Sequence, residues 1–139
     1  MKNLVAFFFL ILAAAAWGLG PSSIGMEREL TEGLFFPVSD YGPEWITADR
    51  NNDGKIDYAM LLNDRGERIF EAIDFNHDGY MDDFYIYRND VLIRREIDQS
   101  FNRSIDLWVY IHEGVYVAGY ERDTSGDGKI DMYRAYGQQ

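Results

Sequence analysis

Short apolar runs separated by polar segments recur along the chain after residue 44, and they are too short for most helices. The first run carries Ile56, Tyr58, Met60 and Leu62. Further runs, rich in β-branched and aromatic residues, cover residues 69–73, 84–87, 91–93, 107–111 and 115–117. Turn sequences containing Asn, Asp or Gly separate them at residues 63–66, 88–90 and 112–114. The pattern predicts an all-β domain of about seven antiparallel strands in meander order.

Four segments of nine residues lie between these pairs of strands and resemble one another. They are Asp49–Asp57, Asp74–Asp82, Asp98–Asp106 and Asp123–Asp131, and their first aspartates are 25, 24 and 25 residues apart. Position 8 of each segment is apolar and predicts a side chain directed towards a core (Ile56, Met81, Ile105 and Ile130). The repeating unit is therefore a loop, a strand, a tight turn and a strand, with loops at one end of the sheet. The pattern leaves open whether this meander forms a small barrel, a two-layer sandwich or an open curved sheet.

The beginning of the chain has a different composition. Lys2 precedes an unbroken apolar run from Leu4 to Ala16, which is followed by small residues. This arrangement is typical of a secretory signal peptide, here residues 1–18, and an uncleaved anchor is the alternative. Residues 19–44 form an irregular N-terminal segment in which residues 26–33 can make a short helix, and residues 45–139 form the β-repeat domain. We therefore expect a secreted or periplasmic protein with no membrane span after cleavage.

Charge and cysteine content narrow the range of functions. The formal net charge is −11, and removal of Lys2 with the signal peptide makes it −12. Such a chain is a poor ligand for nucleic acid, whose phosphates attract basic surfaces. The sequence contains no cysteine, so disulfides and thiolate metal sites are excluded. Small exported domains commonly need a disulfide or a metal ion for stability, and here the metal ion is the option that remains.

The repeated segments carry the oxygen donors that calcium prefers. Positions 1, 3, 5 and 9 offer side-chain oxygens, position 7 offers a backbone carbonyl, and glycine at position 6 permits a sharp turn. In the first segment the predicted ligands are Asp49, Asn51, Asp53, Lys55 (through its carbonyl) and Asp57. In the second they are Asp74, Asn76, Asp78, Tyr80 (carbonyl) and Asp82, and in the fourth Asp123, Ser125, Asp127, Lys129 (carbonyl) and Asp131. The sequence thus predicts about three calcium sites.

This pattern resembles the calcium loops of EF-hands, dockerins, thrombospondin type 3 repeats and integrin-like propeller blades. The resemblance covers nine residues at a time and implies calcium coordination by the positions named above. An EF-hand has a bidentate glutamate at position 12, whereas this chain has Met60, Tyr85 and Arg134 there. We therefore expect EF-hand-like loops set between strands rather than between helices.

The third segment departs from the pattern because Arg103 occupies the position of the glycine. We expect this segment to keep the turn and to bind no ion. The alternative for all four segments is that Asp, Asn and Gly merely form turns. That alternative does not account for acidic residues at positions 1, 5 and 9 of the same three loops.

No catalytic constellation is apparent, and we expect no enzymatic activity. The two histidines, His77 and His112, fall in a loop and in a turn. The favoured interpretation is a calcium-stabilised protein with a structural or interaction role. The alternatives are a calcium sensor, or a calcium-dependent module that binds an extracellular protein or glycan through aromatic faces such as Tyr85 with Tyr87 and Trp108 with Tyr110.

Overall fold

A computed structural model of the chain describes residues 37–136. The predicted signal peptide and the predicted helix over residues 26–33 lie outside the described residues. Eight strands follow a short 3₁₀-helix, η3 (Val38–Asp40). They are β1 (Ile46–Ala48), β2 (Tyr58–Leu62), β3 (Arg68–Ile73), β4 (Asp83–Arg88), β5 (Val91–Ile97), β6 (Leu107–His112), β7 (Tyr116–Arg122) and β8 (Met132–Ala135).

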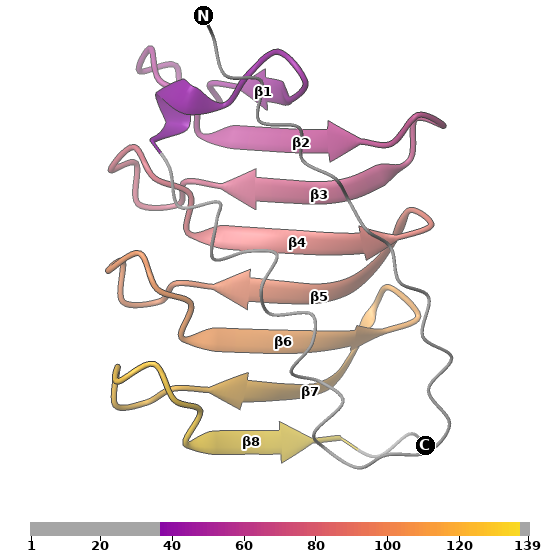
Figure 1. Cartoon of the computed structure of the whole chain (residues 1–139), viewed down its shortest axis with the longest axis vertical. Coiled ribbons are helices and arrows are strands. Elements are labelled where there is room, and N and C mark those ends of the chain that lie inside the picture. The colour runs from indigo at the N-terminus through magenta and orange to yellow at the C-terminus, as the bar shows by residue number, and fades with distance from the viewer. Residues whose placement is uncertain (1–36, 137–139) are drawn as a thin grey trace, which may run out of the picture.

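The strands form one open antiparallel sheet in the order β1-β2-β3-β4-β5-β6-β7-β8, so each strand pairs only with its neighbours in the sequence. The predicted all-β meander is confirmed, with eight strands, and the sheet is the open one of the three predicted forms. Figure 1 shows the Asp-rich loops at the left end of the sheet and the tight turns at the right end. This separation follows from the repeat, because loop and turn alternate along an up-and-down meander.

Each tight turn is followed by a local irregularity, because one residue of the next strand has no partner in the strand before the turn: Ile69 in β3, Ile93 in β5 and Ala118 in β7. The pairing shifts between Leu61 and Leu62, between Ile86 and Tyr87, and between Tyr110 and Ile111. An extra residue in one strand forms a β-bulge and increases the local twist. All three bulges lie at the end of the sheet that carries the tight turns. The turns themselves use left-handed residues, including Asn89 with φ of 52° and Gly114 with φ of 72°.

The core lies on one face of the sheet. A row of directly opposed residues crosses five strand pairs, and all its members are buried: Ala59, Ala72, Phe84, Glu96, Trp108 and Glu121. Position 8 of each loop supports this core as predicted, because Met81 and Ile105 are buried while Ile56 and Ile130 pack against it. At the β1 end, Trp45 contacts Tyr41 and Phe70 edge-on, with ring centroids 5.0 and 5.9 Å apart.

The buried face also holds an ion pair. A guanidinium nitrogen of Arg94 lies 2.6 Å from Oε1 of Glu96, and the two side chains are 4% and 1% exposed. Removing either partner would leave a charge buried without its counter-ion, which is strongly destabilising. Arg94 and Glu96 both lie within β5, which therefore extends to Ile97, beyond the predicted run of residues 91–93.

The opposite face is lined with arginine–tyrosine pairs. The guanidinium of Arg68 lies 4.6 Å from the ring centroid of Tyr87, and that of Arg95 lies 4.7 Å from the ring of Tyr85. The hydroxyl of Tyr87 donates a hydrogen bond of 2.7 Å to Glu71. Each of these rings therefore already has a cationic group against its face.

Among residues 37–136, no helix is long and apolar enough to cross a membrane.

Candidate metal loops

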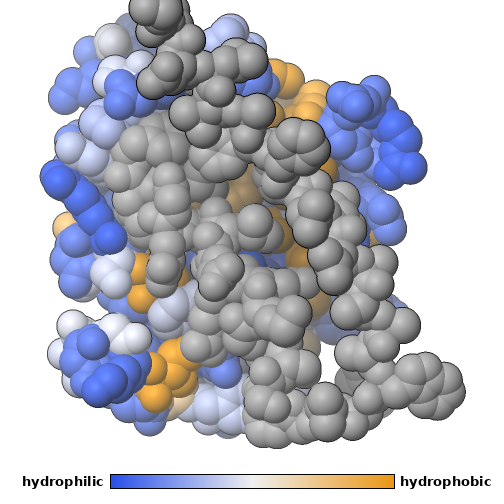
Figure 2. Space-filling model, viewed as in Figure 1, coloured by the Kyte–Doolittle hydropathy of each residue, from blue (hydrophilic) through white to orange (hydrophobic). Residues whose placement is uncertain are grey.

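The four Asp-rich segments all connect strands at the same end of the sheet. We name them loop 1 (Asp49–Asp57), loop 2 (Asp74–Asp82), loop 3 (Asp98–Asp106) and loop 4 (Asp123–Asp131). They follow β1, β3, β5 and β7 respectively. In Figure 2 hydrophilic residues dominate the left edge of the molecule, where Figure 1 places these loops.

The aspartate at position 1 accepts hydrogen bonds from the backbone of its own loop. In loop 2, the N–H groups of Asp78 and Gly79 donate to Asp74 at 3.2 and 2.8 Å. Loops 1 and 3 repeat this arrangement with Asp49 and Asp98 as acceptors. In loop 4, Asp123 accepts from positions 3, 4 and 6 instead. A carboxylate at position 1 thus shapes the loop, apart from any ion.

The aspartate at position 9 closes the loop from the other side. Oδ2 of Asp82 accepts the N–H groups of Phe75 and Asn76 at 2.7 and 3.1 Å. Asp57 and Asp106 accept from positions 2 and 3 of their own loops in the same way, and Asp131 accepts from Thr124. The position-9 aspartates therefore join the first and last residues of each loop.

Two positions of each loop have a left-handed backbone. Position 6 was expected, and Gly54, Gly79, Arg103 and Gly128 have φ of 90°, 95°, 69° and 82°. Position 4 was missed, and Asn52, His77, Phe101 and Gly126 there have φ of 62°, 60°, 57° and 74°. Three of these residues were available signals, because Gly, Asn and His adopt this conformation more readily than most residues. Phe101 is the exception, because phenylalanine does not favour a left-handed backbone.

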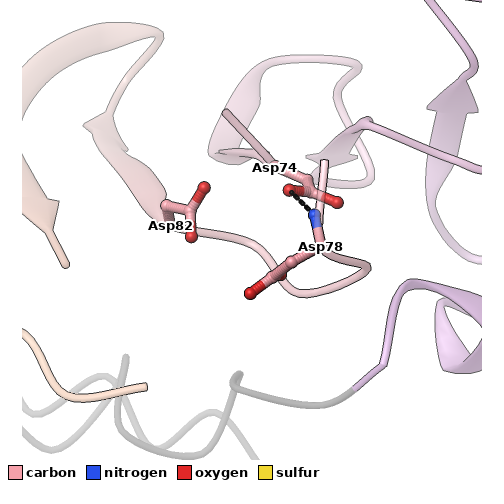
Figure 3. Close-up of side chains that lie close together, drawn as sticks. All are labelled: Asp74, Asp78 and Asp82. Carbon is pink, nitrogen blue, oxygen red and sulfur yellow. Dashed lines mark hydrogen bonds between the residues drawn. The ribbon is translucent and has the colours of Figure 1, made fainter. Parts of the chain in front are cut away.

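Loop 2 brings its three predicted carboxylates together. Single oxygen atoms of Asp74, Asp78 and Asp82 lie within 4.8 Å of one another, close enough to hold a metal ion. Figure 3 shows the three side chains facing a common space, with the N–H of Asp78 donating to Asp74. Asp74 and Asp82 are buried, whereas Asp78 is exposed and leaves the space open to solvent.

Two of these carboxylates, those of Asp74 and Asp82, have raised pKa values. The pKa of Asp82 is raised to about 6, chiefly by burial and to a smaller extent by the neighbouring Asp74 and Asp78 carboxylates, against the opposing effect of the N–H donors. The pKa of Asp74 is also raised, chiefly by burial. A cation between these oxygens would stabilise their ionised forms and reverse this unfavourable electrostatic balance.

Loops 1 and 4 do not show the same convergence. Within the part of the chain that the structure describes, loop 2 contains the one group of three carboxylates at metal-binding separation. In loop 1 the side-chain amide of Asn51 donates to Asp53 at 3.0 Å and engages this carboxylate. In loop 4, Nζ of Lys129 lies 4.0 Å from Asp127, and Asp131 is exposed.

The remaining predicted ligands take part in the loop backbone network. Asn51 and Asn76 each accept the N–H of position 5 at 2.9 Å. At position 7, the N–H groups of Lys55, Tyr80 and Lys129 donate to the position-5 aspartates at 2.9–3.0 Å. The hydroxyl of Ser125 donates to Asp123. Loops 1, 2 and 4 therefore share a local scaffold, and they differ in the direction of their carboxylates.

Loop 2 also contacts its neighbours on both sides. Nδ2 of Asn51 in loop 1 lies 3.1 Å from Nδ1 of His77, and the guanidinium carbon of Arg103 in loop 3 lies 3.6 Å from the ring centroid of Tyr80. The N–H of Val38 donates to the carbonyl of Gly79 at 3.0 Å, and Pro37 forms a bridge with Tyr80. The sequence does not predict the contact of Arg103 with Tyr80 or that of His77 with Asn51, since both depend on the distance between loops in the folded sheet.

No protein-family model, curated protein or solved structure matches this chain. A function for it is therefore inferred from its own residues and their geometry.

Proposed function

We propose that the chain is an exported, non-enzymatic calcium-binding repeat protein in which calcium stabilises the Asp-rich loops and hence the sheet. One observation carries the proposal. Oxygen atoms of Asp74, Asp78 and Asp82 lie within 4.8 Å of one another in a loop whose sequence offers further oxygen donors. Calcium takes six to eight such oxygen ligands, and carboxylates are among the ones it binds best.

Loops 1 and 4 extend the proposal to about three ions because they have the donors of loop 2 at equivalent positions. In loop 1, binding requires Asp53 to exchange its hydrogen bond with Asn51 for the ion. That exchange costs little, because both side chains are exposed to water. Loop 3 is proposed to bind no ion, since Arg103 replaces the glycine and brings a positive charge.

A structural role follows from where the loops lie. Each loop joins two adjacent strands, so an ion that fixes a loop also stabilises the pairing of those strands. At about 1 mM calcium, a site with a dissociation constant near 10⁻⁴ M adds about 1.4 kcal/mol to folding. Three such sites would add about 4 kcal/mol, which is comparable with the whole stability of a small domain.

The glycan-binding alternative receives less support from the aromatic residues. Tyr85 and Tyr87 carry guanidinium groups against their rings, and Trp108 is buried in the core. A sugar would have to displace these contacts before it could stack on the same faces. A role in structure, or in contact with a protein partner, agrees better with this arrangement.

The test is a calcium titration of the metal-stripped protein by calorimetry, with urea unfolding measured in parallel. We expect saturable binding of about three ions and a higher urea midpoint. In Asp78→Asn, one binding event should be lost, while the remaining amide oxygen can still accept the N–H of Tyr80. The control is Asp64→Asn, which removes one charge from an exposed turn at the opposite end of the sheet.

The outcomes separate the candidate functions. Binding that raises the midpoint supports a structural role for calcium. Binding that leaves stability unchanged would favour a sensor or simple surface sites. Absence of binding at millimolar calcium would contradict the proposal and leave the loops as turns.

A further inference from the structure

Loop 3 has an arginine where loops 1, 2 and 4 have a glycine, and this side chain reaches out of its own loop. Arg103 adopts φ of 69°, and its N–H donates to Asp98 at 2.6 Å, as the glycines do in the other loops. Its guanidinium carbon lies 3.6 Å from the ring centroid of Tyr80 in loop 2. Four other arginines (Arg50, Arg68, Arg95 and Arg134) lie 4.6–5.7 Å from the centroids of tyrosine rings. Arg103 and Tyr80 are therefore in unusually close contact.

Tyr80 is well placed to transmit this contact to the carboxylates. It stands at position 7 of loop 2, and its N–H donates to Asp78 at 3.0 Å. The same short stretch is fixed from the other side by the hydrogen bond from Val38 to Gly79 and by the bridge from Pro37 to Tyr80. Loop 2 is thus braced by segments outside it, and it is also the loop in which three carboxylates converge.

We propose that Arg103 is a positioning residue for the cation site of loop 2. By stacking on the ring of Tyr80, Arg103 holds the backbone at position 7, and through its N–H the carboxylate of Asp78. This inference rests on the proposed function, because it assigns a role toward the ion that loop 2 is proposed to bind. Loop 3 would then contribute to the repeat by organising the cation site of loop 2.

Positioning and simple electrostatics predict changes of opposite sign. A guanidinium near a divalent cation repels it, so loss of the Arg103 charge alone would strengthen binding. Loss of a brace would instead weaken binding, because the loop must then be ordered when the ion binds. The direction of the change in affinity therefore distinguishes the two effects.

The experiment uses Arg103→Gly in the full chain, since glycine adopts the left-handed conformation without strain. Calcium is titrated while the backbone amides of Gly54, Gly79 and Gly128 are followed by NMR. These three amides donate to the position-1 aspartates of loops 1, 2 and 4, so each reports its own loop. We expect binding at loop 2 to weaken by about three- to tenfold, as the loss of a cation–π contact implies, with loops 1 and 4 unchanged.

Two further variants check the route of the effect. Tyr80→Leu keeps the backbone but removes the ring, so it should weaken loop 2 to a similar extent, and adding Arg103→Gly should cause little further loss. Arg65→Ala removes an exposed positive charge at the opposite end of the sheet and should leave binding at loop 2 unchanged. The urea midpoint of each metal-free variant shows whether the sheet remains folded.

Unchanged or tighter calcium binding at loop 2 in Arg103→Gly would overturn the inference while leaving the proposed function standing. An additive loss in the double variant would also overturn it, because the two residues would then act separately. If the amide of Gly79 shows no saturable response in the unsubstituted protein, the inference and the proposed function at loop 2 both fail.

Discussion

Asp82 accepts the backbone N–H of Phe75, seven residues earlier, at 2.7 Å, and thereby joins the end of loop 2 to its beginning. The same link joins Arg50 to Asp57, Gln99 to Asp106 and Thr124 to Asp131. It is present in loop 3, which has no glycine at position 6. The position-9 aspartate is therefore part of the loop framework as well as a proposed ligand.

Substitution of Asp106 tests this framework role where no ion is expected. Asp106→Ala leaves the N–H groups of Gln99 and Ser100 without the carboxylate that accepts them at 3.0 Å. We expect the free energy of unfolding to fall by about 1–3 kcal/mol. The loss should be the same in calcium and in chelator, measured by urea unfolding. Asp64→Ala, in an exposed turn, is the control, and a loss seen only in calcium would contradict the interpretation.

The raised pKa of Asp82 predicts a pH dependence for the metal-free protein. The folded state binds this proton more tightly than the unfolded state, because the pKa rises from 3.8 to about 6 on folding. The contribution of Asp82 to stability is therefore most favourable below about pH 4 and is lost as the pH rises through about 6. The change amounts to at most about 3 kcal/mol.

This dependence is measured as urea midpoints from pH 4 to 7.5 in the presence of a chelator. Asp82→Asn has no titrating group at this position and should remove the decline that Asp82 causes. Saturating calcium should also reduce the decline, since the ion stabilises the carboxylate form. A decline of equal size in Asp82→Asn would show that other groups cause it.

Left-handed residues at position 4 offer a stabilising substitution. Phe101 has φ of 57°, a conformation that costs most residues other than glycine about 1–2 kcal/mol. We expect Phe101→Gly to raise the free energy of unfolding by about 0.5–1 kcal/mol, after allowance for lost side-chain contacts and unfolded-state entropy. The matched control is Phe75→Gly in loop 2, where φ is not positive and the same change should destabilise. Equal effects of the two substitutions in thermal unfolding would contradict the argument.

Gly119 lies where the backbones of β7 and β8 approach closely, so a larger residue at this position should clash with β8. A Cβ atom there would lie 2.6 Å from the carbonyl oxygen of Arg134 and 3.2 Å from Cα of Ala135. Since backbone must move to relieve this contact, Gly119→Ala should destabilise by about 1–3 kcal/mol. Hydrogen exchange should show faster exchange in β8, while Val117→Ala in the same strand should leave β8 protected. Normal protection of β8 in Gly119→Ala would refute the steric argument.

The repeat in the sequence accounts for much of the fold. The 24- and 25-residue spacing and the short apolar runs predicted the meander, the separation of loops from turns, and position-8 side chains directed towards the core. Whether the sheet closes into a barrel or stays open was not predictable, because the pattern of strands and turns does not fix the curvature of the sheet. The buried pair of Arg94 and Glu96 was missed for a related reason, since charged residues normally lie on the solvent face of a strand.

Within the candidate site, the sequence predicts which residues could act as donors but not how they are arranged. Loops 1 and 2 have the same residues at positions 1, 3, 5, 6 and 9, yet three carboxylates converge in loop 2 alone among the described loops. Loop 2 also has contacts with Val38, Asn51 and Arg103, which are distant from it in the sequence. Neighbouring loops are separated by two strand spacings, about 10 Å, which long side chains can span. A pattern confined to nine residues cannot report such contacts.

The meander order also bears on how the chain folds. Because every strand pairs only with the strand before or after it, contacts are made between residues close in sequence. Such a low contact order favours rapid folding, and structure can begin at any hairpin and spread to its neighbours in both directions. The end strands β1 and β8 have one partner each and should fray first. By the same logic, a central unit of loop and hairpin can be removed or duplicated as a block without rewiring the rest of the sheet.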